Sequence, residues 1–243
     1  MKKKQKISPY EKWFNKKKQQ KIELNDMNPT RIATDVFSQW AEQGRDIGME
    51  KGHSASVSEM LESAIPNLPQ PFSAIDIGCG NGWVVRKLTK LGASQAEGVD
   101  GAQQMVSNAR RIDPQGNYHL AKLPEWTPVN RFDLVHTMEF LYYLKNPQEM
   151  LTKIHDEWLE DGGWLVAGVD HYLEHEASLE WPGQLDVHMT TMSIDEWKIA
   201  LQNAGFQNIR IWQAATSEKF PGTLAFLGQR ALDSRSVRGA AEP

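Results

Sequence analysis

Residues 74–82 have the sequence AIDIGCGNG. The apolar side chains of Ala74, Ile75 and Ile77 predict a buried parallel strand. Three glycines at alternate positions then predict a tight turn, because glycine takes positive φ freely and lets a ligand approach the backbone. A helix is expected from Trp83, and its free N–H groups offer a site for a carboxylate or phosphate. The stretch therefore predicts a strand–turn–helix unit with a ligand site at the turn.

An acidic residue closes the next predicted strand. The run QAEGV occupies residues 95–99 and is followed by Asp100. A carboxylate about 20 residues after such a glycine turn can accept hydrogen bonds from both hydroxyls of a ribose. The alternative is an α/β domain that merely turns tightly here, because a glycine-rich turn alone is a weak signal.

Strand and helix patterns alternate through the rest of the chain, and this alternation predicts a parallel sheet with helices on both faces. A capping box at Ser193 and Glu196 predicts a further helix that ends at Gly205. The expected strands cover 74–77, 95–100, 118–120, 132–138, 164–169, 209–214 and 223–228, and the expected helices cover 29–65 in part, 83–91, 103–111 and 147–160.

Two motifs carry a family resemblance. Residues 76–82 follow the pattern D-x-G-x-G-x-G and resemble the first motif of class I S-adenosylmethionine (SAM)-dependent methyltransferases. Residues 132–139, FDLVHTME, are similar to the fourth-strand motif of that family. The resemblance covers 72–170 well and the C-terminal part in outline. It implies an α/β fold with a doubly wound, mostly parallel seven-stranded sheet, a Rossmann-like methyltransferase fold, preceded by an N-terminal helical lid.

This fold implies a division of the chain into four parts. We expect a basic arm at 1–28, a helical lid at 29–70, a SAM-binding domain at 71–230 and a disordered tail at 231–243. Within the lid, the resemblance implies that Arg45, Met49 or His53 faces the cofactor or substrate. The alternative for these three residues is helix packing around a flexible hinge.

The resemblance also implies the cofactor site, with SAM as methyl donor and S-adenosylhomocysteine (SAH) as product. Asp76 and the glycine turn would hold the methionine end of SAM, and Asp100 the ribose hydroxyls. The acid that often binds adenine after the third strand is missing here, so adenine would rest on backbone groups or on apolar side chains. The implied cofactor residues are Asp76, Gly78, Cys79, Gly80, Gly82, Asp100, Gly101, Leu120, Ala121, Leu123 and Glu139.

Candidate catalytic residues follow the fourth and fifth strands. His171 is the first choice for a general base, because it follows the fifth strand and an imidazole titrates near working pH. The alternative is that His171 caps a strand end or points to solvent. The other predicted catalytic residues are Glu139 and Tyr143, and further candidates are Tyr142, Asp170, Tyr172 and His175. No metal site is predicted, because the pair His171 and His175 lacks a secure third ligand.

Residues 137–144 bear on the acceptor. They are similar to the same segment of quinone-pathway O-methyltransferases, which have Glu-His where this chain has Tyr142-Tyr143. That departure disfavours a quinone. Aromatic residues could instead line a pocket for a small acceptor, with plain core packing as the alternative for Trp181. The pocket candidates are Tyr142, Tyr143, Tyr172, Trp181 and His188.

Charge is unevenly distributed. Residues 1–21 hold nine lysines and one glutamate, whereas the other 222 residues hold 18 basic and 30 acidic side chains, a net charge of −12. The basic arm could bind RNA, an anionic membrane surface or an acidic partner, or simply be a solvated charge run. The acidic body is a poor platform for a long phosphate backbone.

Composition narrows the class further. The single cysteine excludes a disulfide framework, and no apolar run reaches the length of a membrane span. No apolar segment follows the N-terminal lysines as in a secretory signal, so a cytoplasmic protein is expected.

The sequence thus predicts a SAM-dependent methyltransferase that transfers a methyl group to an O or N atom of a small molecule. The alternatives are an RNA or protein methyltransferase that uses residues 1–21, and a non-catalytic SAM-binding scaffold.

Overall fold

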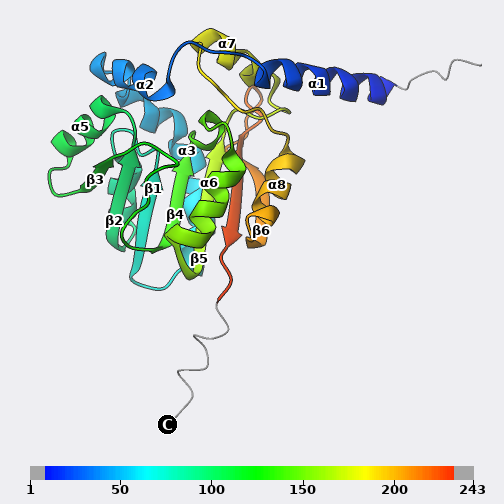
Figure 1. The fold of residues 1–243 in the computed structure, drawn as a ribbon. Helices are drawn as coiled ribbons and strands as arrows, with labels where there is room; N and C mark the ends of the chain where they lie inside the picture. Colours follow the sequence, from blue (N-terminus) through cyan, green and yellow to red (C-terminus); the bar gives the residue numbers. More distant parts are fainter. Residues whose placement is uncertain (1–8, 233–243) are drawn as a thin grey trace, which may run out of the picture.

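A computed structural model describes residues 9–232, and its centre is a seven-stranded sheet (Figure 1). The strands are β1 (Phe72–Ile77), β2 (Ala93–Asp100), β3 (Asn117–Leu120), β4 (Phe132–Met138), β5 (Leu159–Val169), β6 (Gln207–Ala214) and β7 (Thr223–Gln229). Their order is β3-β2-β1-β4-β5-β7-β6. Strands β1 to β5 are parallel, and β7 is antiparallel to both β5 and β6. The predicted fold class is confirmed, including the antiparallel terminal pair.

Helices cover both faces of the sheet (Figure 1). They are α1 (Pro9–Asn25), α2 (Ala33–Glu42), α3 (Ile47–Ala64), α4 (Trp83–Lys90), α5 (Gln103–Ile112), α6 (Pro147–Lys153), α7 (Trp181–Leu185) and α8 (Ile194–Asn203). Successive strand residues point to opposite faces. On β4, Leu134 therefore packs in the cluster with α3 and α4, whereas Val135 packs in the cluster with α6 and α8. Burial on both faces explains the apolar composition of the central strands.

Most predicted elements lie within two residues of their predicted ends. Strand β4 has the predicted bounds, and α5 ends one residue later than expected. The capping box of α8 is present, because Ser193 and Glu196 each accept a hydrogen bond from the other's backbone N–H. These elements carry strong local signals and follow them.

One boundary prediction was wrong. The helix expected at 147–160 becomes a π turn at Ile154–Trp158, and β5 begins at Leu159 rather than at Trp164. Trp158 and Leu159 are both buried, and Leu159 pairs with Phe132 of β4. The glycines at 162 and 163 lie inside the strand, where the register shifts, and do not stop a helix. Burial of two apolar side chains thus favours an early strand over two more turns of helix.

The N-terminal half also differs from expectation. Pro29 starts no helix, because α2 begins at Ala33. Helix α3 begins at Ile47 and includes Gly48 and Gly52, where an irregular segment was expected. The buried side chains of α3 lie between Ser56 and Ala64, so packing of this part onto the sheet supports the whole helix. The division at 28, 70 and 230 stays a prediction, and the expected tail lies outside the described residues from 233 onward.

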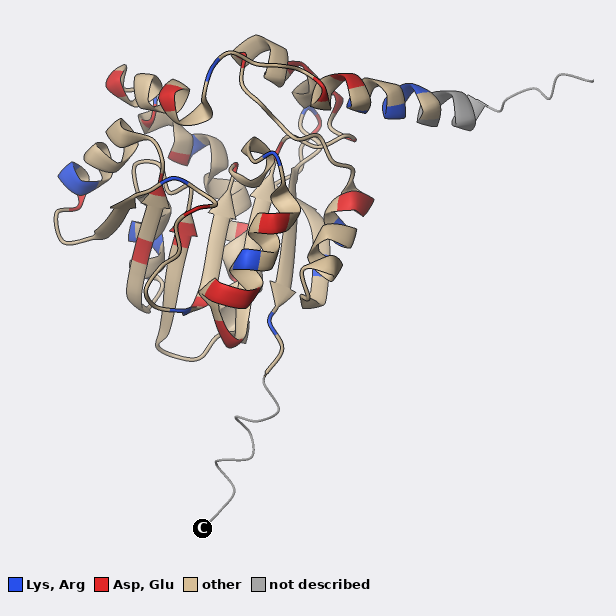
Figure 2. Cartoon of the chain, viewed as in Figure 1, with Lys and Arg blue, Asp and Glu red and all other residues tan. Residues whose placement is uncertain are grey.

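Helix α1 lies at the end of the molecule where the parallel strands end, and its N-terminal part projects away from the body (Figure 1). Lys17 Nζ lies 2.9 Å from Glu176 Oε1, and Lys21 pairs with Glu196. Thr191 N donates to Asn25 Oδ1 at 2.8 Å. Acidic residues are spread over the body, and α1 carries both basic and acidic residues (Figure 2). Two lysines of the arm are therefore engaged by the body.

Candidate active site

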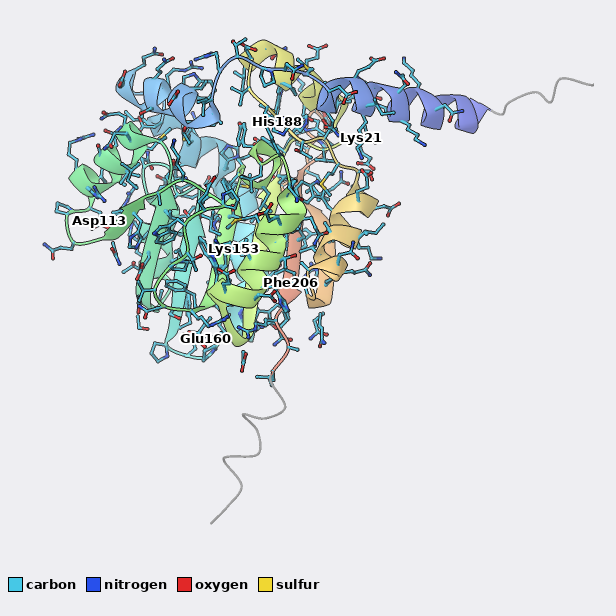
Figure 3. The ribbon with its side chains drawn as sticks, in the orientation of Figure 1. Lys21, Asp113, Lys153, Glu160, His188 and Phe206 are labelled. Atoms are coloured by element: carbon cyan, nitrogen blue, oxygen red, sulfur yellow. The ribbon has the colours of Figure 1, made fainter. Side chains whose placement is uncertain are left out.

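A cavity of ≈ 860 Å³ lies at the carboxyl ends of β1, β2, β4 and β5. The strand order places β1 between β2 and β4, which is the switch point where open α/β sheets bind ligands. Lys21 and His188 lie at this end of the molecule, and Glu160 lies at the opposite end (Figure 3). The topology thus brings the loops after five strands around one space.

The floor of the cavity is the glycine turn. Gly78 and Gly80 have φ of +71° and +53°, and both line the cavity. The N–H groups of Gly78 and Cys79 donate to the carbonyl of Val99 on β2, at 2.8 and 3.1 Å. A Cβ added at Gly80 would meet no atom nearer than 3.8 Å. The turn therefore leaves open space above its backbone.

Asp100 closes the floor from β2. Its Oδ2 accepts from Gly80 N at 2.9 Å, and its Oδ1 accepts from Ala102 N at 2.7 Å. Burial raises the pKa of Asp100 above its ordinary value, although these backbone donors oppose the shift. The carboxylate is thus fixed by backbone donors on both oxygens and faces the cavity beside the turn.

Asp76 lies below the turn and is paired with His136. The Asp76 Oδ1 to His136 Nδ1 distance is 2.6 Å, and His136 is fully buried. Burial raises the pKa of Asp76, and the adjacent imidazole only partly offsets that rise. His136 lies inside β4, and its buried Nε2 has no hydrogen-bond partner among the described residues.

Two carboxylates lie where β4 and β5 end. Glu139 has φ of 58°, a conformation that non-glycine residues rarely adopt and that is concentrated at functional sites. Its Oε2 accepts from Tyr142 Oη at 2.7 Å, and its Oε1 accepts from Asp170 N at 2.5 Å. Burial, and next the charge of Asp170, raise the pKa of Glu139 well above its ordinary value. The Tyr142 and Tyr143 hydroxyls are 3.3 Å apart and continue this polar chain.

A histidine from the lid approaches the same place. His53 on α3 lines the cavity, and its Nδ1 lies 3.8 Å from Asp170 Oδ2. Burial lowers the pKa of His53, and the charge of Asp170 opposes the shift. Of the three lid candidates, Met49 and His53 line the cavity, whereas the Arg45 guanidinium lies 4.1 Å from the centre of the Trp40 ring and does not line it.

The roof is built from residues far apart in sequence. Arg31 forms a parallel bridge with Val187, and Arg31 N donates to the Asp186 carbonyl at 3.1 Å. The Phe37 ring packs edge-on against Tyr143 with centroids 5.3 Å apart. Phe37 and Trp40 of α2 line the cavity, together with Ile32, the residue before this helix. This role depends on contacts between distant segments, such as Arg31 with Val187 and Phe37 with Tyr143, which no local pattern signals.

His171 is not placed as predicted for a general base. It is fully buried and does not line the cavity. Its Nδ1–H donates to the Ser178 carbonyl at 3.0 Å, and the Thr191 hydroxyl donates to Nε2 at 2.8 Å. Burial lowers its pKa to about 4. Both ring nitrogens are hydrogen-bonded to residues of segment 170–191, which follows β5. The structure therefore argues against a catalytic role for His171.

Most of the other predicted residues meet at the cavity. Tyr172 and His175 are buried away from it, and Gly82 and Leu120 also do not line it. Cavity-lining residues that the sequence did not single out include Thr34 and Met105. Those predicted residues that line the cavity are Asp76, Gly78, Cys79, Gly80, Asp100, Gly101, Ala121, Leu123, Glu139, Tyr142, Tyr143, Asp170, Trp181 and His188.

This fold and cleft define a SAM-dependent methyltransferase. The chain belongs to a methyltransferase-domain family, whose model matches residues 49–211. It is similar to a methyltransferase solved in complex with the Haloferax volcanii Trm112 methyltransferase activator, with TM-score 0.70 and 26% identity over 81% of this chain and 98% of that one. The enzyme class and the cofactor predicted from the sequence are confirmed.

The curated relatives are longer proteins, and this chain matches only part of each. A tRNA U34 carboxymethyltransferase of Alteromonas mediterranea is 27% identical over 57% of this chain and 46% of its own. A trans-aconitate 2-methyltransferase of Agrobacterium fabrum is 26% identical over 58% of this chain and 52% of its own. The chain spans about half the length of the curated relatives it matches.

Across residues 9–232, no group of three or more His, Cys, Asp or Glu side chains is arranged to hold a metal ion. Within the same range, every helix is too short or too polar to cross a membrane.

Proposed function

We propose that this methyltransferase acts on a small-molecule acceptor held beneath the lid. The single observation that carries the proposal is the roof over the cavity. The Arg31–Val187 bridge and the contact of Phe37 with Tyr143 join the lid to the far side of the cleft. A partly covered pocket with aromatic walls suits a small ligand.

The residues on the floor fit the cofactor. Asp100 would hold the ribose hydroxyls, and the open backbone at Gly80 would admit the methionine end beside Asp76. Ala121 and Leu123 line the cavity where adenine would pack. SAM supplies a methyl group already activated on a sulfonium. What the chain must add is positioning, exclusion of water and, for a protonated acceptor, a base.

Glu139, Tyr143 and their neighbours would orient the acceptor. The chain of hydrogen bonds from Asp170 N through Glu139 to the two tyrosine hydroxyls fixes all of these groups relative to the turn. His53 and Asp170 replace His171 as the candidates for proton transfer, because both line the cavity.

Incubation with methyl-labelled SAM and cell extract tests the proposal. The extract is separated into RNA, protein and small molecules, and label is expected in the small-molecule fraction. The Asp100→Ala variant serves as the cofactor-site control. Label confined to RNA or protein, or to no fraction while SAH still binds, would contradict a small-molecule acceptor.

A second candidate is an RNA substrate. Relatives named tRNA U34 carboxymethyltransferases, and the lysines of residues 1–21, favour it. Two of those lysines pair with Glu176 and Glu196, which leaves fewer charges for phosphate. RNA binding that weakens with salt and is lost on deletion of residues 1–21 would support this candidate. Absence of RNA binding at low salt would reject it.

A further inference from the structure

The acceptor end of the cavity carries two buried carboxylates side by side. Glu139 and Asp170 follow the adjacent strands β4 and β5, whose residues Met138 and Gly168 are in register. Burial raises the pKa of both carboxyl groups, and the charge of Asp170 raises the pKa of Glu139 further. Two anions placed together in a low dielectric are stable only beside a compensating cation.

Arg31 and Lys145 line the cavity, but neither is paired with these carboxylates in the described part of the chain. Within residues 15–232, no lysine or arginine forms an ion pair with Glu139 or Asp170. His53 stands beyond hydrogen-bond distance at 3.8 Å, and burial disfavours its charged form. The Arg31 guanidinium, which also lines the cavity, donates to Gln39 Oε1 at 3.0 Å.

Asp170 has hydrogen-bonding capacity left over. The residue is 7% exposed and lines the cavity, and its Oδ1 is buried with no hydrogen-bond partner among the described residues. A buried acceptor without a donor costs about 1–3 kcal/mol, and more when it is charged. A donor that a ligand brings to the same carboxylate would offset part of that cost.

The adjoining walls are aromatic. Phe37, Tyr143 and Trp181 line the same cavity, and the ring centroids of Tyr142 and Tyr143 are 4.4 Å apart. Aromatic faces attract ammonium groups, by about 0.5–2 kcal/mol depending on how far the cation is desolvated. The carboxylates and the aromatic rings therefore both favour a positively charged ligand.

We infer that the acceptor is an amine, bound as its ammonium form by Asp170 and Glu139 between the aromatic walls. This inference rests on the proposed small-molecule function. A carboxylate acceptor would instead meet two like charges, which is a built-in rejection of that class.

The transfer then balances in two steps. The bound ammonium gives one proton to Asp170, whose pKa is raised by burial, and becomes a neutral amine. The nitrogen lone pair forms the new N–C bond while the methyl–sulfur bond breaks and its electron pair stays on sulfur. The positive charge thus moves from sulfur to the methylated nitrogen, beside the same carboxylates.

The charge of the labelled product tests the inference. Wild-type protein is incubated with methyl-labelled SAM and a small-molecule extract, and the products are first separated from residual SAM, which is itself a cation, and then passed over a strong cation exchanger at neutral pH. Retained, base-stable label is expected. Unretained or base-labile label would overturn the amine inference and leave the proposed small-molecule function standing, whereas label only in RNA or protein, or in nothing, would overturn the proposed function itself.

Matched variants assign the binding residue. Asp170→Asn is expected to lower the rate of labelling of the retained fraction at least tenfold, while the affinity for SAH stays within twofold of wild type. Glu180→Gln changes an exposed residue of the same segment, 170–191, and should leave both the labelling rate and the SAH affinity unchanged. Unchanged labelling by the Asp170→Asn variant would overturn the role of Asp170, and the SAH measurement separates that result from misfolding.

Discussion

Asn81, inside the glycine turn, donates a hydrogen bond from Nδ2 to the Asp46 carboxylate at the start of α3, 3.2 Å away. Asn108 of α5 donates to the same Asp46 oxygen at 3.1 Å. Asp46 is 2% exposed and thus joins the lid, the cofactor turn and α5 in one buried contact. The lid is therefore coupled to the turn that it covers.

Replacing Asp46 with alanine is expected to destabilise the protein by about 2–4 kcal/mol, because two buried amide donors lose their acceptor. We also expect weaker SAH binding, because the turn loses its contact with the lid. Urea unfolding and titration with SAH measure the two effects. Glu42→Ala, four residues earlier and exposed, is the matched control and should change neither. Equal stability of the two variants would contradict the coupling.

The sequence predicts features that depend on neighbouring residues better than contacts between residues far apart along the chain. The turn at Gly78 and the cap at Ser193 are local signals, and both appear where expected. The Asp46–Asn81 contact joins residues 35 positions apart, and no periodicity encodes it. His171 was misassigned for the same reason: its place after β5 is local, whereas its burial depends on Ser178 and Thr191.

Gly82 shows a second constraint on the turn. Its φ is +78°, and a Cβ there would lie 2.4 Å from Tyr118 Cε1. Gly82→Ala should therefore cost both backbone strain and a clash, about 3 kcal/mol or more in unfolding free energy. Gly44→Ala is the matched control, because φ is +70° but no atom lies within 4 Å, so only strain of about 1–2 kcal/mol is expected. Equal losses in urea unfolding would show that the clash with Tyr118 is absent.

Asp100 is the test of the cofactor floor. Replacing it with alanine removes the proposed partner of the ribose hydroxyls and the acceptor for Gly80 N and Ala102 N. We expect SAH affinity to fall at least tenfold in a calorimetric titration. Glu125→Gln, an exposed change on the loop after β3, should retain wild-type affinity. Wild-type affinity in Asp100→Ala would mean that the ribose binds elsewhere.

The buried imidazole of His171 makes a prediction about acid stability. Its pKa is lowered to about 4 in the folded protein, chiefly by burial, against 6.5 for the ordinary group. The unfolded chain therefore binds a proton that the folded chain refuses, and the free energy of unfolding should fall as the pH drops from 6.5 towards 4. The full effect is about 3 kcal/mol, levelling off below pH 4.

Buried carboxylates with raised pKa, such as Glu139, contribute the opposite slope, so the effect is measured as a difference between variants. His171→Gln should lose this part of the slope in urea unfolding at several pH values, whereas Thr191→Val, which removes a hydrogen bond but keeps the imidazole, should retain it. Parallel curves for wild type and His171→Gln would show that the imidazole takes up its proton equally well in both states, contrary to its enclosed position.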